Sequence, residues 1–128
     1  MSKAKDLRIF LSYDRSDSVL ARQLAAMLSG VGYDVFPGED WPKTIQEALK
    51  RANAMVVLVS EHSMKSPWVF KEVNYALGSK NYSRRVVPVF VEGSPEVPWI
   101  LRKFKSVRLL TDVDRTAQLI AQALQSAA

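Results

Sequence analysis

The chain contains no cysteine and a single histidine. The first absence excludes disulfide bonds, thiolate metal sites and cysteine nucleophiles, and is typical of a reducing compartment. His62 has no partner at metal-ligand spacing, so we interpret it as a loop residue and expect no metal site. No apolar run has the length of a membrane span, and Met1–Asp6 is polar, unlike a signal peptide. We therefore expect a cytoplasmic protein without a membrane partner.

Glycine is scarce, and none of it forms a phosphate-binding loop. Gly38 and Gly93 stand alone, which excludes a Rossmann fingerprint and a P-loop. A receiver domain needs an aspartate after the third strand, where this chain has a serine. Several serines follow predicted strands without a His–acid pair to activate a nucleophile, namely Ser12, Ser60, Ser63 and Ser66.

The net charge is +5, but the basic residues are not interleaved with aromatic ones as on a base-stacking surface. We therefore expect no nucleic-acid partner, and interpret the charge as solvated faces with some attraction for an anionic ligand. With 128 residues and 48% apolar composition, the chain is expected to form one domain over 1–128.

Strand and helix signals alternate along the chain. Apolar runs predict strands at 7–11, 33–36, 54–59, 86–91 and 106–110. Capping residues followed by apolar residues at helical spacing predict helices beginning near 16–17, 44, 66 and 112, and Gly30 and Gly32 are expected to end the first.

This alternation predicts a doubly wound, flavodoxin-like α/β fold: a five-stranded parallel sheet in the order 2-1-3-4-5 with helices on both faces. The run at 54–59 has no polar face, which is typical of a central parallel strand. Ligands of such sheets bind where the strand order reverses, at the carboxyl ends of strands one and three. Here those ends are 12–15 and 60–63.

Trp68 and Glu72 lie four residues apart in the helix that follows the third strand. This spacing places both side chains on one helix face. An aromatic plate beside a carboxylate can stack a heterocycle and hold a negative charge against the sugar attached to it. The alternative is that Trp68 packs half-buried and Glu72 is a solvated helix charge.

Several segments together resemble TIR domains. Residues 9–13 resemble the first conserved box, and 56–60 followed by 66–72 resembles the third strand and the helix after it. Residues 86–91 and 97–101 are similar to the fourth strand and the proline-containing loop of bacterial members. The resemblance covers about residues 6–124 and extends to the helix of an NAD-cleaving animal TIR domain.

The resemblance implies NAD⁺ glycohydrolase activity, with NAD⁺ as substrate and no separate cofactor. It makes Glu72 the catalytic carboxylate and Trp68 a wall of the nicotinamide or adenine pocket. It also implies nucleotide contacts from residues around the strand ends: Ser12, Tyr13, Asp14, Arg15, Phe36, Ser60 and Ser66. Asp14 replaces a basic residue of the animal enzyme, which makes Arg15 the expected cation near the pyrophosphate.

The family's loop after the second strand helps to assemble active oligomers. In this chain the loop, 37–43, is short, and the resemblance implies self-association contacts from Gly38, Glu39, Asp40 and Trp41. The expected setting is bacterial antiphage defence or a similar signalling system.

One carboxylate suffices for this chemistry because nicotinamide leaves NAD⁺ as a neutral molecule and needs no general acid. A carboxylate near the ribose stabilises the ribosyl cation, which then yields ADP-ribose or a cyclic ADP-ribose. Two other interpretations stay open: a non-catalytic TIR–TIR interaction module, and a nucleoside hydrolase or deoxyribosyltransferase with a similar sheet.

Overall fold

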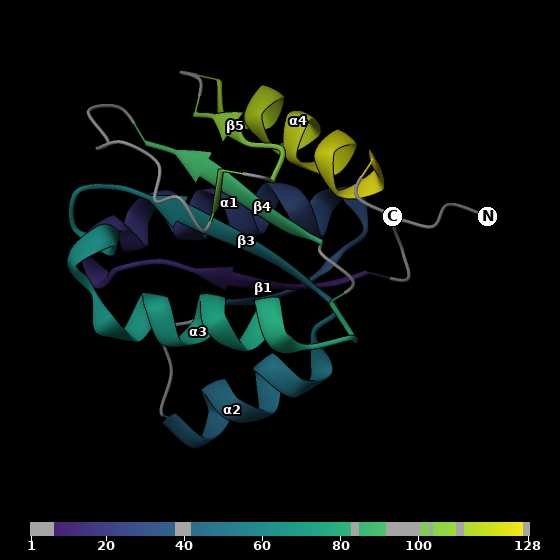
Figure 1. Cartoon of the computed structure of the whole chain (residues 1–128). Coiled ribbons are helices and arrows are strands. Elements are labelled where there is room, and N and C mark those ends of the chain that lie inside the picture. The colour runs from purple at the N-terminus through teal and green to yellow at the C-terminus, as the bar shows by residue number, and fades with distance from the viewer. Residues whose placement is uncertain are drawn as a thin grey trace.

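A parallel sheet forms the centre of the molecule (Figure 1). The structure is a computed structural model, and it describes residues 7–37, 42–82, 85–91, 101–102, 104–109 and 112–126. Within these residues the sheet has five strands: Arg8–Ser12 (β1), Asp34–Pro37 (β2), Ala54–Val59 (β3), Val86–Phe90 (β4) and Val107–Arg108 (β5). Their order, β2-β1-β3-β4-β5, confirms the predicted topology.

Helices cover both faces of this sheet, as predicted. They span Ser18–Val31 (α1), Pro42–Arg51 (α2), Pro67–Gly78 (α3) and Val113–Ser126 (α4), with short 3₁₀ turns at Arg15–Asp17 (η2) and Ser63–Lys65 (η3). The apolar cores divide accordingly, one between the sheet and α1 with α4, the other between the sheet and α2 with α3. In Figure 1, α2 and α3 lie below the strands and α4 lies above them.

The central strand β3 explains this two-sided arrangement. All six of its residues are buried, and it pairs with β1 on one side and β4 on the other. Ala54, Val56 and Leu58 belong to the core under α1 and α4. The alternate residues, Met55, Val57 and Val59, belong to the core under α2 and α3. An apolar strand without a polar face is therefore stable only between two helical layers.

The helix ends follow the capping signals with three exceptions, the first of which is that α2 begins at Pro42 and not at Thr44. Ser66 accepts a hydrogen bond from the Val69 N–H and Pro67 opens α3, as expected. Gly32 ends α1 in the left-handed conformation at φ 118°, whereas Gly30 lies within the helix. Asp17 occupies the cap position of α1, but its side chain makes no capping bond there.

The edge strand β5 is short and pairs with β4 at only two positions. A strand was predicted at 106–110, yet β5 contains only Val107 and Arg108. Pro88 of β4 pairs with Val57 of β3, and β4 lies next to the edge strand β5. Proline has no backbone N–H to donate and is found mainly near sheet edges.

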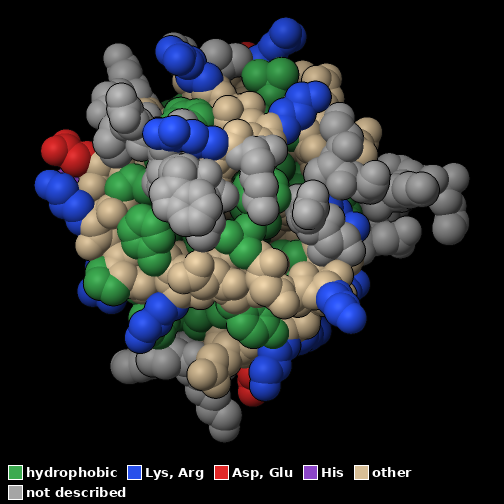
Figure 2. Space-filling view, in the orientation of Figure 1, with side chains coloured by type: hydrophobic (Ala, Val, Ile, Leu, Met, Phe, Trp, Pro, Cys, Tyr) green, Lys and Arg blue, Asp and Glu red, His purple; other side chains and the backbone are tan. Residues whose placement is uncertain are grey.

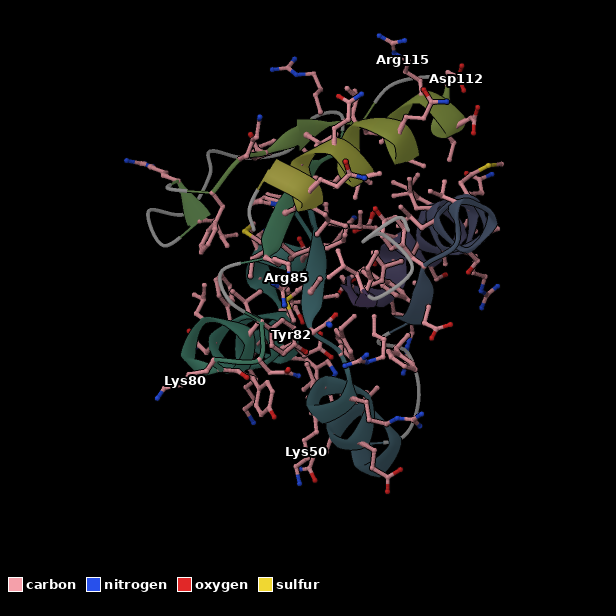
Figure 3. The ribbon with its side chains drawn as sticks, turned by 90° about the vertical axis from the view of Figure 1, so that its right-hand side faces the viewer. Lys50, Lys80, Tyr82, Arg85, Asp112 and Arg115 are labelled. Atoms are coloured by element: carbon pink, nitrogen blue, oxygen red, sulfur yellow. The ribbon has the colours of Figure 1, made fainter. Side chains whose placement is uncertain are left out.

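The amino ends of β3 and β4 are joined by side-chain hydrogen bonds. The Tyr82 hydroxyl donates to the Leu49 carbonyl at 2.8 Å, and Arg85 Nε donates to the Asn53 carbonyl at 2.9 Å. In Figure 3, Tyr82 and Arg85 lie near each other, above Lys80 and Lys50. These bonds fasten the segment after α3 to α2 and to the turn between α2 and β3, at the amino ends of the strands and opposite the strand ends discussed below.

On the face shown in Figure 2, Lys and Arg side chains are spread around the surface and are not gathered in one patch. This distribution fits the interpretation of the net charge as solvated faces. Within the described residues, no helix is both long and apolar enough to cross a membrane.

Candidate functional site

A buried carboxylate lies at the carboxyl end of β1. Glu72 of α3 is only 2% exposed, and its Oε1 accepts a 2.7 Å hydrogen bond from the Ser12 hydroxyl at the end of β1. The buried face of α3 also contains Val69, Val73 and Ala76. Glu72 thus occupies one position of an otherwise apolar stripe, so it is not the solvated helix charge of the alternative interpretation.

The second carboxylate oxygen of Glu72, Oε2, is buried without a hydrogen-bond partner among the described residues. Leaving a buried acceptor unpaired costs roughly 1–3 kcal/mol, and such atoms are frequently found at functional sites. Burial raises the pKa of Glu72 to about 7, although the hydrogen bond from Ser12 and the nearby Trp68 side chain lower it in part. Both protonation states of Glu72 are therefore populated near neutral pH.

Trp68 lies one turn before Glu72 on α3 and is 39% exposed. The four-residue spacing brings the two side chains together, as expected, and the effect of Trp68 on the Glu72 pKa reflects this proximity. Part of the indole faces solvent while the carboxylate is covered. The pair therefore offers an accessible aromatic surface next to an inaccessible charge.

The loops that follow β1 and β3 are bonded to each other. Ser60, directly after β3, donates from its hydroxyl to Asp17 Oδ2 in η2 at 2.6 Å. The Ser63 N–H donates to the same Ser60 hydroxyl at 3.1 Å, and the Ser60 N–H donates to the Ser63 hydroxyl at 2.8 Å. These bonds occupy Ser60, so its hydroxyl is engaged in structure at the position where a ligand contact was expected.

One predicted contact, Tyr13, points away from Glu72, whereas Phe36 packs on the same side of the sheet as α3. Tyr13 is 3% exposed and packs in the core under α1 and α4, on the opposite face of the sheet from Glu72. Phe36 packs beside the core under α2 and α3, with the Arg51 guanidinium 5.8 Å from its ring centre. The structure does not bring the Tyr13 side chain to Glu72.

The remaining predicted residues surround the strand ends. Asp14 accepts a hydrogen bond from the Ser16 N–H, which is the main cause of its lowered pKa, and Arg15 is exposed. The Ser66 hydroxyl caps α3. The expected self-association residues, Gly38, Glu39, Asp40 and Trp41, lie outside the described residues.

Among the described residues, no group of three or more His, Cys, Asp or Glu side chains could hold a metal ion. His62 is exposed in the loop after β3.

Sequence reasoning missed Asp17 as part of this region, and it placed Ser63 at the strand ends without predicting its bonds to Ser60. Asp17 follows a strand and precedes a helix, which is the normal signature of a cap. Its actual partner, Ser60, is 43 residues away, and no local pattern indicates that pairing. Ser63 was recognised only as one of several serines near strand ends.

Comparisons with known proteins agree on the fold. A sequence model of the TIR domain family matches residues 9–124. The TIR domain of the Toll-related receptor TRR-2 from Hydra magnipapillata superposes with a TM-score of 0.71 at 17% identity, covering 93% of this chain and 98% of that one. The SEFIR domain of interleukin-17 receptor B gives 0.60 at 14% identity, covering 93% and 97%.

A more distant likeness extends to other flavodoxin-like proteins. A CheY-like receiver domain from Methanospirillum hungatei JF-1 superposes with a TM-score of 0.53 at 13% identity, covering 93% of this chain and 94% of that one. No curated protein sequence matches the chain. At such identities the structures establish the fold alone, and the family follows from the sequence match over nearly the whole chain. The chain belongs to the TIR domain family.

Proposed function

We propose that this TIR domain cleaves NAD⁺ between nicotinamide and ribose, releasing nicotinamide and ADP-ribose or a cyclic ADP-ribose. The observation that carries the proposal is the state of Glu72. One of its oxygens is held by Ser12, the other is buried and unpartnered among the described residues, and Trp68 lies beside it. A carboxylate prepared in this way suits a reaction that develops positive charge on a sugar.

In the proposed reaction the C1′–N bond breaks and its electron pair stays on the nicotinamide nitrogen, which neutralises the pyridinium. Glu72 Oε2 stabilises the ribosyl cation by its charge and by contact with the ribose hydroxyls. Water then bonds to C1′ and loses a proton to give ADP-ribose, or an atom of the adenine or a ribose hydroxyl attacks to give a cyclic product. Loss of one such charged group typically reduces turnover on the order of 10²- to 10³-fold.

Charge complementarity also suits this substrate. Glu72 is only partly ionised near neutral pH, because its pKa is raised to about 7. The positive charge of a bound pyridinium would increase the ionised fraction. The exposed face of Trp68 is proposed to stack against a ring of the dinucleotide. Ser12 donates a hydrogen bond to the carboxylate. Arg15, exposed in the loop after β1, is proposed to contact the pyrophosphate.

We further propose that self-association activates the enzyme, through the loop containing 38–41, and that the protein acts in the cytoplasm in antiphage defence or signalling. Other TIR domains are the expected protein partners.

A non-catalytic interaction module is the second candidate. It is favoured by three exposed apolar residues of α1, Val19, Met27 and Val31, which are eight and four residues apart and so lie on one side of the helix. Such a surface suits contact with a second TIR domain. Substituting Met27→Glu should then weaken self-association measured by analytical ultracentrifugation.

Incubation of the protein with NAD⁺ tests the enzymatic proposal. Nicotinamide release is measured by chromatography over a range of protein concentrations, for the wild type, Glu72→Gln and Glu47→Gln. Glu47 is an exposed glutamate of α2 and serves as the matched control. We expect release that increases more steeply than protein concentration, is lost in Glu72→Gln and persists in Glu47→Gln.

A Glu72→Gln variant that keeps more than half of the wild-type turnover would contradict the assignment. Absence of release from the wild type at every concentration would favour the interaction module. Parallel incubation with free nucleosides distinguishes NAD⁺ cleavage from nucleoside hydrolysis.

A further inference from the structure

The end of α2 is held by side chains from distant parts of the chain. Arg8 Nε, in β1, donates to the Arg51 carbonyl at 2.6 Å, and Arg85 Nε donates to the Asn53 carbonyl at 2.9 Å. Asn53 Oδ1 in turn accepts from the Arg8 N–H at 2.7 Å. These donors satisfy carbonyl groups that a helix end leaves unpaired. Two guanidinium groups are thereby fixed around residues 51–53, at the amino ends of β1 and β4.

This capping uses only part of each guanidinium group. Arg8 donates from Nε alone, so within the described residues both of its terminal nitrogens keep their N–H donors. Arg85 also donates from Nη2 to the Asn81 carbonyl at 3.1 Å, which leaves the donors of Nη1. A guanidinium that is already held in place loses little conformational freedom when it binds an anion.

Three exposed cations lie close to this pair. Lys50 and Arg51 are in the last turn of α2, and Lys80 follows α3. The Tyr82 hydroxyl joins these two segments, because it donates to the Leu49 carbonyl at 2.8 Å. In Figure 3, Lys80 and Lys50 both lie below Tyr82. We call the five cations at this end of the sheet the basic pole: Arg8, Lys50, Arg51, Lys80 and Arg85.

Two carboxylates accompany the basic pole within the described residues. Asp34 pairs with Arg8 in the sheet register, and Glu47 lies one turn before Arg51 in α2. Both are exposed, and neither forms an ion pair with a described cation. The cations therefore outnumber the carboxylates, and the local potential at this end of the sheet is positive.

An exposed aromatic ring adjoins the basic pole. Tyr75 is 40% exposed, and its ring centre lies 6.2 Å from that of Tyr82, with 81° between the ring planes. Because the rings meet nearly at right angles, Tyr82 covers at most one face of the Tyr75 ring. Fixed guanidinium groups with exposed ammonium groups suit a phosphate chain, and an exposed ring next to them suits a base. Together these groups match a nucleotide better than a bare anion.

We propose that the basic pole binds the phosphate chain of a free nucleotide, with Arg8 and Arg85 as the fixed donors and Tyr75 as the surface for the base. This site lies at the amino ends of the strands, whereas Glu72 bonds to Ser12 at the carboxyl end of β1. The inference therefore does not depend on the proposed NAD⁺ cleavage.

A titration of the isotopically labelled protein with ADP tests this site. Backbone amide resonances are followed by two-dimensional NMR at low salt, with adenosine and inorganic pyrophosphate as separate probes. We expect ADP to shift the amides of residues 8, 50–53 and 80–82 and to leave those of 68–72 unchanged. Pyrophosphate should shift the same amides more weakly, adenosine should leave them unchanged, and added salt should weaken the binding of ADP.

A double substitution, Lys50→Gln with Arg51→Gln, removes two cations and leaves the capping donors in place. Lys65→Gln with Arg115→Gln is the matched control, because both residues are exposed beside the carboxyl ends of the strands and the net charge falls equally. We expect the first double variant to bind ADP about tenfold more weakly, and the second to stay within about twofold of the wild type. Thermal unfolding checks that each variant is folded.

Tyr75→Leu separates the base from the phosphates. This variant should bind ADP more weakly than the wild type and pyrophosphate equally well, because only the stacking surface is lost. An unchanged affinity for ADP would remove Tyr75 from the site.

Absence of ADP-induced shifts at the basic pole, or an equal loss of affinity in both double variants, would overturn the inference. Shifts confined to residues 12 and 68–72 would also overturn it, because the phosphates would then lie at the candidate catalytic site. Sedimentation with phosphatidylserine vesicles in the absence of ADP binding would assign the pole to a membrane surface and overturn the nucleotide site. ADP binding at the pole with no NAD⁺ cleavage would support this inference and refute the proposed function.

Discussion

Ser12 and Glu72, 60 residues apart in the chain, are joined by a buried 2.7 Å hydrogen bond between hydroxyl and carboxylate. The bond satisfies Oε1 and stabilises the ionised form, while Oε2 has no partner among the described residues. The end of β1 and helix α3 are thus linked through the carboxylate of Glu72. The first predictions follow from this pair.

Removing the hydroxyl should raise the pKa of Glu72. In Ser12→Ala the burial that raises this pKa stays, and the hydrogen bond that lowers it is lost. We expect the pH midpoint of kcat/KM to move to higher pH and the rate at neutral pH to fall roughly tenfold. Ser12→Thr keeps a hydroxyl, so its pH midpoint should stay close to that of the wild type. An unshifted midpoint in Ser12→Ala would contradict a role for this bond.

The wild-type enzyme should lose activity as the pH falls below about 7, where Glu72 becomes protonated. Only the ionised carboxylate stabilises a ribosyl cation, so kcat/KM should decrease about tenfold per pH unit below that value and level off above it. A profile that stays flat from pH 5 to 9, measured in one buffer series, would exclude Glu72 as the ionising group.

Glu72 should also make folding stability depend on pH. Its pKa is about 7 in the folded chain against 4.5 for an ordinary glutamate, so the folded state holds more protons between these values. Stability contributed by this group is therefore present below pH 4.5 and lost as pH rises through 7, by up to about 3 kcal/mol.

Glu72→Gln removes this titration. The free energy of unfolding of Glu72→Gln minus that of the wild type should increase from pH 4.5 to pH 8, which urea titrations at both pH values can measure. A difference that stays constant with pH would show that the carboxyl is not buried in the folded protein.

Trp68 should contribute to catalysis and, because it is 39% exposed on α3, less to stability than a fully buried tryptophan. We expect Trp68→Ala to fold normally by thermal unfolding but to lower turnover or change the ratio of ADP-ribose to cyclic product. Trp68→Phe keeps an aromatic plate and should stay closer to the wild type. Identical rates and product ratios in all three proteins would place Trp68 in packing alone.

Two glycines of the first helix should respond oppositely to alanine. Gly32 has φ 118°, so Gly32→Ala should destabilise the fold by about 1–2 kcal/mol. Gly30 lies inside α1 with no atom within 4 Å of an added Cβ, so Gly30→Ala should stabilise by about 0.5–1 kcal/mol. Midpoints of chemical unfolding report both signs, and destabilisation by both changes would place Gly30 outside the helix.

Much of the fold was accessible from local patterns. The run at 54–59 coincides with β3, because six apolar residues without a polar face fit only a strand covered on both sides. The Ser66-Pro67 start of α3 was likewise predicted, since the serine cap and the proline both act within one helical turn. The spacing of Trp68 and Glu72 correctly indicated a shared neighbourhood.

What the patterns could not supply was the direction of side chains in three dimensions. Helical spacing groups Trp68 with Glu72 but does not say that one is exposed and the other buried. Tyr13 directly follows the strand end, yet its side chain continues the alternation of β1 and enters the core with Ile9 and Leu11. The pairing of Asp17 with Ser60 depends on tertiary packing, which no local motif encodes.

The hydrogen bonds of Tyr82 and Arg85 have a mechanical consequence for α3. They anchor the segment after this helix to Leu49 of α2 and to Asn53 just before β3, while the helix begins at Pro67, in the loop region after β3. If α3 tilts, we expect it to pivot near Gly78, because these bonds hold that end. Such a tilt would displace Trp68 more than any residue nearer Gly78.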